Sequence, residues 1–255
     1  MNTNLNILTI PLEKYLSLDK KETIIVIPCG CIENHGYHLP LGTDCLLAQS
    51  FAYKINESFP SILTPVISYG SDSVPNSGGG FFMPGTLSVS GKEFTTHIYT
   101  LIKRYMKDGF KKFIVLNGHL ENKMFIHNAI FDIYKEGIDD FTNVMMIDYW
   151  DLIDNEVNDI VFGKDEVNYD AEHGGVLETS LMLYLYEDLV NDYENKSDKI
   201  ILTDKFTIIN NDIINKTIKK KEAILSDPKS ATKKKGFLMF EHINNRIKEI
   251  IENNF

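Results

Sequence analysis

Short apolar runs alternate along the chain with segments whose apolar residues recur at helical spacing, and this alternation constrains the fold more than any other feature. The runs predict buried strands over residues 22–28, 62–68, 112–116 and 143–147. Helices between successive strands favour a parallel sheet that they cover on both faces. We therefore predict an α/β fold with three layers, α/β/α, around a mostly parallel sheet, formed by residues 1–255 as a single domain.

Helix signals follow the predicted strands at several points. Thr43 is placed to cap a helix through residues 46–55, and Ser90 with Glu93 forms a capping-box pattern. The lysine-rich residues 216–235 are most simply a solvated surface segment. A last amphipathic helix is predicted near the C-terminus, and its buried stripe would consist of Phe240, Ile243, Ile247 and Ile250.

The composition excludes several classes of partner. The formal net charge of −10 argues against nucleic acid or an anionic membrane as the main partner. No apolar run approaches the roughly 20 residues of a membrane span, and residues 1–14 lack the basic and apolar regions of a secretory signal. Three cysteines, two of them only two residues apart, do not make a disulfide framework. We therefore expect a cytoplasmic protein.

The stretch from Pro28 to Asp44 follows the first predicted strand and gathers possible metal ligands. Glu33 and His35 can share one face, because alternate side chains of an extended segment point the same way. Asp44, after a turn, can come back to meet them. Carboxylate and imidazole groups at the carboxyl end of a strand suit a hydrolytic divalent-metal site. The alternative is a polar loop whose Glu and His cap nearby backbone groups.

Two further clusters of histidine and carboxylate stand in glycine-containing loops between strands and helices. His119 and Glu121 form one, and Glu172, His173 and Glu178 form the other. The clusters together supply more donors than one metal needs, so two divalent ions that share a carboxylate and a bridging water are the economical solution. Oxygen and nitrogen donors suit zinc or manganese. We interpret Glu172 as a residue that orients its loop rather than one that reacts.

Other residues near these clusters leave alternatives open. Cys29 and Cys31 lie in phase with the first ligand candidates, so a cysteine-containing zinc site is one alternative, although buried small side chains on a strand are the commoner case. We interpret His38 as a loop histidine bonded to the backbone rather than as a ligand. The glycine-rich residues 69–88 are too long for a plain connection and predict a functional loop.

Six segments along the chain combine into one pattern: Glu33–Gly36 with Asp44, Ser77–Gly80, Pro84–Thr86, Asn117–Asn122, Tyr149–Asp151 and Glu172–Ser180. Together these motifs resemble the creatininase (creatinine amidohydrolase) family, and its creatinine-hydrolysing members more than its distant ones. The resemblance extends over about residues 10–250. The combination of motifs is highly specific.

The resemblance implies a three-layer α/β/α domain that assembles as a homohexamer and holds two divalent metal ions per chain, zinc and/or manganese. Glu33 and His119 would hold one ion, and His35 and Glu121 the other. Asp44 would bridge the two ions.

The same resemblance implies a catalytic role for His173, with Glu178 as its supporting acid. A water held between the two ions would attack the ring carbonyl of creatinine. His173 would shuttle a proton to the leaving ring nitrogen, which opens creatinine to creatine.

Residue-by-residue matching assigns the substrate contacts to Ser77, Leu120, Tyr169 and Asp170. Creatininase has a tyrosine and a tryptophan where this chain has Leu120 and Tyr169, so the substrate depends on positions that differ. One alternative is therefore another small amide, a formamide or a cyclic ureide, hydrolysed at the same binuclear site. The non-enzymatic alternative is a metal-binding protein without turnover.

Overall fold

Five strands form the central sheet of the computed structural model, which describes residues 4–74, 77, 80–137, 139, 142–163, 172–193, 211–220 and 223–255. The strands are β1 (Asn4–Asn6), β2 (Ile24–Cys29), β3 (Ser61–Leu63), β4 (Lys112–Asn117) and β5 (Asn143–Asp148). Among the described residues the strand order is β1-β3-β2-β4-β5, and every neighbouring pair runs parallel. The predicted parallel sheet is confirmed.

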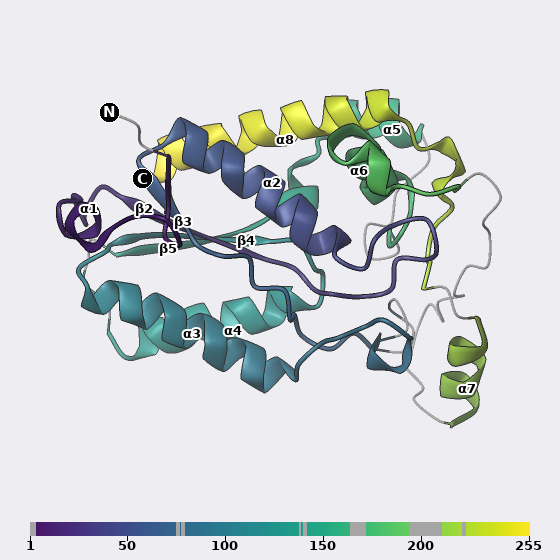
Figure 1. The fold of residues 1–255 in the computed structure, drawn as a ribbon, viewed down its shortest axis with the longest axis horizontal. Coiled ribbons are helices and arrows are strands. Elements are labelled where there is room, and N and C mark those ends of the chain that lie inside the picture. The colour runs from purple at the N-terminus through teal and green to yellow at the C-terminus, as the bar shows by residue number, and fades with distance from the viewer. Residues whose placement is uncertain are drawn as a thin grey trace.

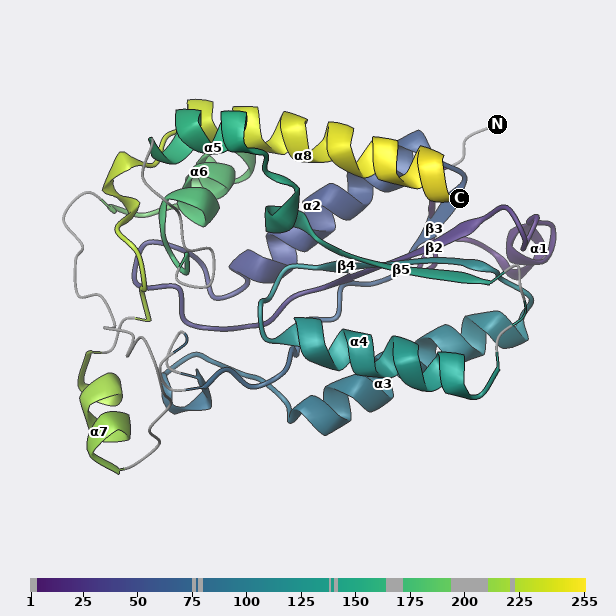
Figure 2. The ribbon, with the colours of Figure 1, turned by 180° about the vertical axis from the view of Figure 1, so that it is seen from behind.

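Helices cover both faces of this sheet. The helices of the described residues are α1 (Leu12–Leu16), α2 (Thr43–Ser58), α3 (Gly91–Lys107), α4 (Asn122–Lys135), α5 (Asn155–Phe162), α6 (Val176–Leu185), α7 (Asn211–Lys220) and α8 (Lys233–Asn254). Short 3-10 turns are η1 (Gly80–Phe82), η2 (Tyr149–Leu152), η4 (Glu187–Leu189) and η5 (Pro228–Ser230). Figures 1 and 2 show α2, α5, α6 and α8 on one side of the sheet and α3 and α4 on the other, so the three-layer prediction is confirmed.

The central strand β2 explains why both faces need a cover. Its residues alternate between two cores: Ile24 and Val26 face the α2 and α8 layer, whereas Ile25 and Ile27 face the α3 and α4 layer. All four side chains are buried, as is typical of a parallel sheet with helices on both sides.

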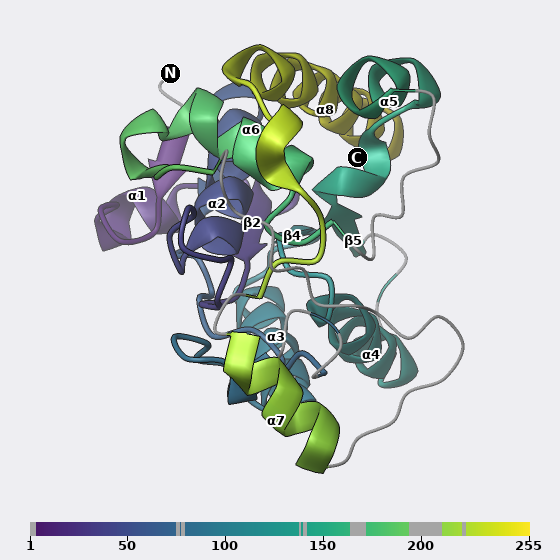
Figure 3. The same ribbon diagram turned by 90° about the vertical axis from the view of Figure 1, so that its right-hand side faces the viewer.

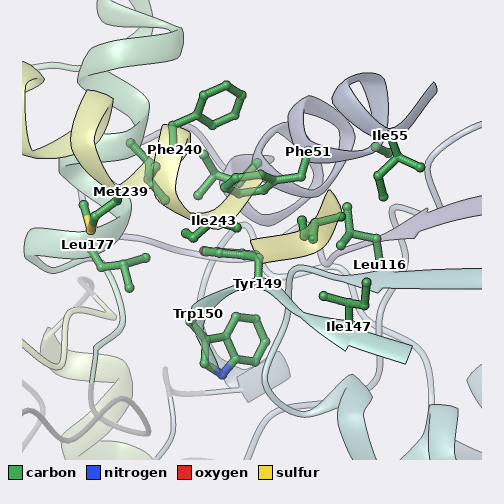
Figure 4. Close-up of a cluster of buried hydrophobic side chains, with 14 of the residues drawn as sticks. Phe51, Ile55, Leu116, Ile147, Tyr149, Trp150, Leu177, Met239, Phe240 and Ile243 are labelled. Carbon is green, nitrogen blue, oxygen red and sulfur yellow. The ribbon is translucent and has the colours of Figure 1, made fainter. Parts of the chain in front are cut away.

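Aromatic side chains fill the core between the sheet and α8. The ring of Phe51 lies 5.0 Å from the ring of Tyr149 and 5.0 Å from that of Phe240, measured between centroids. Figure 4 shows this group together with Leu177 of α6 and Trp150. The core therefore ties α2, α6 and α8 to the carboxyl end of β5, next to which the site lies.

Helix boundaries match the predictions in part. The capping box at Ser90 and Glu93 is present and starts α3. The prediction that Thr43 caps α2 is wrong, because Gly42 is the N-cap and the Thr43 hydroxyl donates instead to the Pro40 carbonyl at 2.7 Å. Among the described residues, no helix is both long and apolar enough to cross a membrane.

Three other sequence predictions need correction. The strand predicted over residues 62–68 is regular only to Leu63, and past Pro65 it pairs with the end of β2 again through one isolated bridge at Ile67. In α8 the buried residue after Ile247 is Ile251 rather than Ile250, since a four-residue step keeps to the same face. Residues 216–235 are not one solvated segment, because residues 223–225 within them are buried.

Figure 3 shows the side of the molecule where β2 and β4 end and where α2 and α6 begin. The carboxyl ends of parallel strands meet at one edge of a sheet, and ligands of such sheets bind there. Helix α7 lies at the same end of the molecule (Figures 1 and 3).

Candidate functional site

The side chains predicted to bind metal and the two predicted to act in catalysis meet at this edge of the sheet. Four separate segments bring them there: the loop after β2, the first turn of α2, the loop after β4, and the segment that leads into the first turn of α6. These segments contribute, respectively, Glu33 and His35, Asp44, His119 and Glu121, and His173 and Glu178.

Two glycines allow the first turn of α2 to approach both strand loops closely. A Cβ atom at Gly30 would lie 2.6 Å from the backbone nitrogen of Cys45, and one at Gly118 would lie 2.4 Å from the carbonyl oxygen of Asp44. Any larger residue at either position would push the helix away. The glycines therefore position Asp44 between the histidines of the two loops.

The two carboxylate oxygens of Asp44 face different histidines. Oδ1 lies 2.9 Å from Nε2 of His35, and Oδ2 lies 3.1 Å from Nδ1 of His119. A second carboxylate completes each side, with Glu33 Oε1 3.0 Å from His119 Nδ1 and Glu178 Oε1 3.5 Å from His35 Nε2. We call the group of Glu33, Asp44 and His119 position A, and the group of His35, Asp44 and Glu178 position B.

Backbone carbonyl groups fix which nitrogen of each histidine faces the carboxylates. Nε2 of His119 lies 3.1 Å from the carbonyl oxygen of Ser71, and Nδ1 of His35 lies 3.1 Å from that of Glu33. A carbonyl oxygen only accepts, so the nitrogen that faces it carries the proton. In the neutral form of each ring, the other nitrogen presents a lone pair to the carboxylates.

This arrangement stabilises positive charge at both positions. Burial lowers the pKa of His35, but the carboxylates of Glu178 and Asp44 raise it by more, so its pKa lies well above the usual value. The pKa of His119 is raised in the same way, chiefly by Glu33. Within the described part of the chain, the buried Nε2 of His35 and Oδ2 of Asp44 have no hydrogen-bond partner. Such atoms are suited to bind cations.

The donor set fits divalent metal ions. Carboxylate oxygens and imidazole nitrogens are ligands that zinc and manganese accept. Within the described residues, three groups bring one ligand atom from each member to within 4.8 Å of the others. These groups are Cys31 with Glu33 and His119, Glu33 with His35 and His173, and His35 with Asp44 and Glu178.

Glu121 lies on the outer side of position A. Its Oε2 is 3.3 Å from Nε2 of His119, and its Oε1 accepts a hydrogen bond from the Ser77 hydroxyl at 2.5 Å. The resemblance implied that Glu121 shares an ion with His35. In this structure its ion-pair contact is with His119 instead.

His173 points one nitrogen of its ring at the ligands. Its Nε2 lies 2.9 Å from the carbonyl oxygen of Asn34, so this nitrogen carries the proton. Its Nδ1 then faces the site, 3.7 Å from Oε1 of Glu33. The ring also lies against that of His35, with 4.2 Å between centroids. A nitrogen held in this way can take up and release a proton at the site.

The expected partnership between Glu178 and His173 takes a different form. Oε2 of Glu178 accepts the backbone N–H of Gly174 at 2.7 Å, and Oε1 faces His35. Glu178 is therefore placed beside a predicted ligand, while a backbone carbonyl orients the His173 ring.

A cavity that opens to solvent lies next to positions A and B. Ser77 and Leu120, two residues for which substrate contacts were predicted, are among the residues that line it. Tyr169 and Asp170 lie outside the described residues. The sequence reasoning assigned no substrate contact to several other lining residues: Ser73, Tyr149, Trp150, Leu177 and Leu225.

Ser73 and Glu172 support the site from its rim. The Ser73 hydroxyl donates to Oε2 of Glu33 at 3.2 Å, and it lies in the loop that was predicted to be functional. Glu172 accepts the N–H of Leu177 at 2.6 Å and the hydroxyl of Ser226. Burial raises the pKa of Glu172 to about 7. These contacts join the start of α6 to the segment before α8.

Comparison with known proteins places the chain in a family. A family model for creatinine amidohydrolase matches residues 11–251. Creatinine amidohydrolase from Pseudomonas putida is 32% identical over 241 residues, which cover 92% of this chain and 90% of that protein. A crystal structure of creatinine amidohydrolase (creatininase) matches with a TM-score of 0.88 at 30% identity, covering 99% of this chain and 98% of that one.

Other solved creatininases agree with this match. A mutant complexed with creatine and a mutant of Zn-Zn type each give a TM-score of 0.88, and a creatininase named with Mn gives 0.87, all at 29% identity. Each match covers at least 98% of both chains. The chain therefore belongs to the creatininase (creatinine amidohydrolase) family.

Proposed function

We propose that this chain hydrolyses a small cyclic amide, creatinine to creatine, at a binuclear metal site. The observation that carries the proposal is the placement of Asp44, whose two carboxylate oxygens each face a different histidine nitrogen. A carboxylate shared in this way is the usual bridge between two divalent ions. The match to creatinine amidohydrolase from Pseudomonas putida supports the substrate class.

Positions A and B are the proposed sites of two ions, zinc and/or manganese. Glu33, Asp44 and His119 would hold one ion, and His35, Asp44 and Glu178 the other. Glu121 remains a predicted ligand, although its contact is with Nε2 of His119 and not with the Nδ1 that faces position A. When bound, the two ions lower the pKa of a water that they share and polarise the amide carbonyl.

His173 is the proposed proton shuttle. Its Nδ1 faces the site and takes the proton of the attacking water. It then delivers that proton to the ring nitrogen of the substrate as the carbon–nitrogen bond breaks. The hydrogen bond from Nε2 to Asn34 keeps Nδ1 turned toward the reacting atoms throughout.

Substrate recognition is proposed to combine one polar rim with apolar walls. Ser77 lines one part of the cavity, and Leu120 and Trp150 line others. A flat ring such as that of creatinine can pack on the indole of Trp150. The predicted contacts of Tyr169 and Asp170 complete the proposed pocket.

Leu120 also motivates the second candidate, another small amide such as a formamide or a cyclic ureide. Its side chain lines the cavity but offers no hydroxyl to a polar substrate. A substrate panel with the Leu120→Tyr variant separates the candidates, because restoring the hydroxyl should favour creatinine.

The decisive experiment combines metal analysis with turnover by the purified protein. We expect two divalent ions per chain, creatine formed from creatinine, and loss of both on treatment with a chelator. Two bound ions with hydrolysis of a formamide or cyclic ureide instead would select the second candidate. Two bound ions with no hydrolysis of any amide in the panel would leave a metal-binding protein without turnover.

We also propose that residues 1–255 act as one domain, in a cytoplasmic homohexamer without nucleic-acid or membrane partners. The free, buried thiols of Cys29, Cys31 and Cys45 suit a reducing compartment. The net charge of −10 disfavours binding to nucleic acid. Light scattering coupled to size-exclusion chromatography tests the assembly, and a monomeric mass would contradict it.

A further inference from the structure

Cys31 is a buried thiol that the proposed reaction does not use. Its side chain and those of Glu33 and His119 each bring one ligand atom to within 4.8 Å of the other two. Glu33 and His119 are also the residues that form position A together with Asp44. The sulfur atom therefore lies at the edge of a proposed cation position.

Local backbone geometry explains why this thiol reaches the site. Cys31 and Glu33 are two residues apart in the segment that follows β2, so their side chains leave the backbone on the same side. Gly70 packs against the thiol from behind, since a Cβ atom there would lie 3.0 Å from Cβ of Cys31 and 2.5 Å from the carbonyl oxygen of Gly30.

The other two cysteines provide a contrast. Cys29 and Cys45 are equally free and buried, but neither belongs to a metal-capable group within the described residues. All three thiols donate to a backbone carbonyl: Cys29 to Leu116 at 3.6 Å, Cys45 to Cys31 at 3.5 Å and Cys31 to Ile32 at 3.7 Å. Among the cysteines of the described residues, what distinguishes Cys31 is its place beside Glu33 and His119.

A second observation at this position also points to a cation. Oδ2 of Asp44 is buried, has no hydrogen-bond partner in the described part of the chain, and lies 3.1 Å from His119 Nδ1. If Glu33, His119 and Asp44 bind one ion, the sulfur of Cys31 would supply the fourth donor atom. Four donors are the usual number for zinc.

We propose that Cys31 is a sulfur ligand of position A and makes this position prefer thiophilic ions such as zinc over manganese. The inference rests on the binuclear site proposed above and deepens it. When the ion binds, the S–H bond of Cys31 breaks, a sulfur–metal bond forms and the proton passes to solvent. Soft thiolate selects zinc, whereas manganese prefers oxygen ligands.

The separations are compatible with this coordination. Zinc binds sulfur at about 2.3 Å and histidine nitrogen at about 2.1 Å, so two such atoms on one ion lie at most about 4.4 Å apart. The ligand atoms of Cys31, Glu33 and His119 lie within 4.8 Å of one another, which exceeds that separation by less than about 1 Å. Rotation about the Cα–Cβ bond of one cysteine can close this difference.

Cobalt substitution provides a readout that does not depend on activity. The full-length protein is stripped with a chelator, reloaded with Co²⁺, analysed for bound cobalt, and examined for the near-ultraviolet sulfur-to-cobalt charge-transfer band. We expect two cobalt ions per chain and the band in wild type and in Cys29→Ala. In Cys31→Ser we expect the band to be lost.

Competition between Zn²⁺ and Mn²⁺ gives the second measurement. In Cys31→Ser, the preference for Zn²⁺ over Mn²⁺ should fall at one position per chain. Loss of an outer partner of a metal ligand costs roughly 10–100-fold, so loss of a direct ligand should cost at least as much.

Two bound cobalt ions without the band in wild type would overturn the sulfur ligand and leave the binuclear site standing. No bound cobalt in wild type would overturn both. A band that persists in Cys31→Ser would also overturn the inference.

Discussion

Nε2 of His35 lies 2.9 Å from Oδ1 of Asp44, and both side chains are shielded from solvent. In the neutral ring this nitrogen offers a lone pair, because the backbone carbonyl of Glu33 binds the proton on Nδ1. Two electron-rich atoms so close together repel each other unless a proton or a metal ion neutralises the repulsion. Since the second oxygen of Asp44 stands in the same relation to His119, both cation positions depend on one carboxylate.

Asp44→Asn keeps the size of this side chain and removes its charge. We expect the affinity for each of two ions to fall by roughly 10–100-fold or more, because both positions lose a ligand. Creatinine hydrolysis should fall with the metal content. Mass spectrometry of bound metal checks the result, with Asp132→Asn on the exposed side of α4 as a matched control that keeps both ions. Two tightly bound ions in Asp44→Asn would contradict the bridging role.

His173→Ala should separate catalysis from metal binding. Although His173 lies near Glu33 and His35, positions A and B keep Glu33, His35, Asp44, His119 and Glu178 in this variant, so we expect bound metal to remain at the wild-type level. Loss of the proton shuttle should lower kcat by roughly 10²–10⁴-fold. Steady-state kinetics beside metal analysis checks this, and His127→Ala on the exposed face of α4 is the control. A kcat within a few fold of wild type would rule out the shuttle.

The sheet and the meeting point of the ligands could be predicted from the sequence for a physical reason. Strands buried on both faces are continuous apolar runs, and loops at the carboxyl ends of parallel strands converge. Glu33, His35 and His119 follow two adjacent strands, so they meet without detailed knowledge of helix packing. The strand predicted over residues 62–68 was too long, because its apolar pattern continues past Pro65 although regular pairing with β2 ends at Leu63 and returns only as one bridge at Ile67.

Features set by tertiary packing could not be predicted in this way. The choice of partner for Glu178 depends on how α6 packs against α2 and α8, which no local pattern encodes. Leu225 lines the cavity from a segment about 50 residues beyond His173. The backbone carbonyl groups of Ser71, Glu33 and Asn34 that orient the three histidines carry no signal in the side-chain sequence.

Glu178→Gln and Glu121→Gln together test how the ions are shared among the carboxylates. Because Glu178 faces His35, its loss should empty position B and leave about one ion per chain. Glu121→Gln should instead weaken position A indirectly, because Glu121 contacts Nε2 of His119 and not the Nδ1 that faces this position. Equilibrium dialysis of stripped protein against zinc measures both stoichiometries. Two ions in Glu178→Gln and only one in Glu121→Gln would contradict this assignment and support the pairing of His35 with Glu121.

Glu172 should make the stability of the folded protein depend on pH, because burial raises the pKa of its carboxyl from 4.5 to about 7. Between these values the folded state keeps a proton that the unfolded state releases, so the free energy of unfolding falls as pH rises, by at most about 3 kcal/mol. Glu172→Gln keeps an acceptor for the Leu177 N–H and removes the titration. The free energy of unfolding, measured with urea on chelator-treated protein, should therefore fall less between pH 4.5 and 7 in this variant than in wild type.

Glu156→Gln, at an exposed position of α5, is the control, and its free energy of unfolding should change with pH as in wild type. Equal falls in wild type and Glu172→Gln would show that the carboxyl does not titrate in this interval.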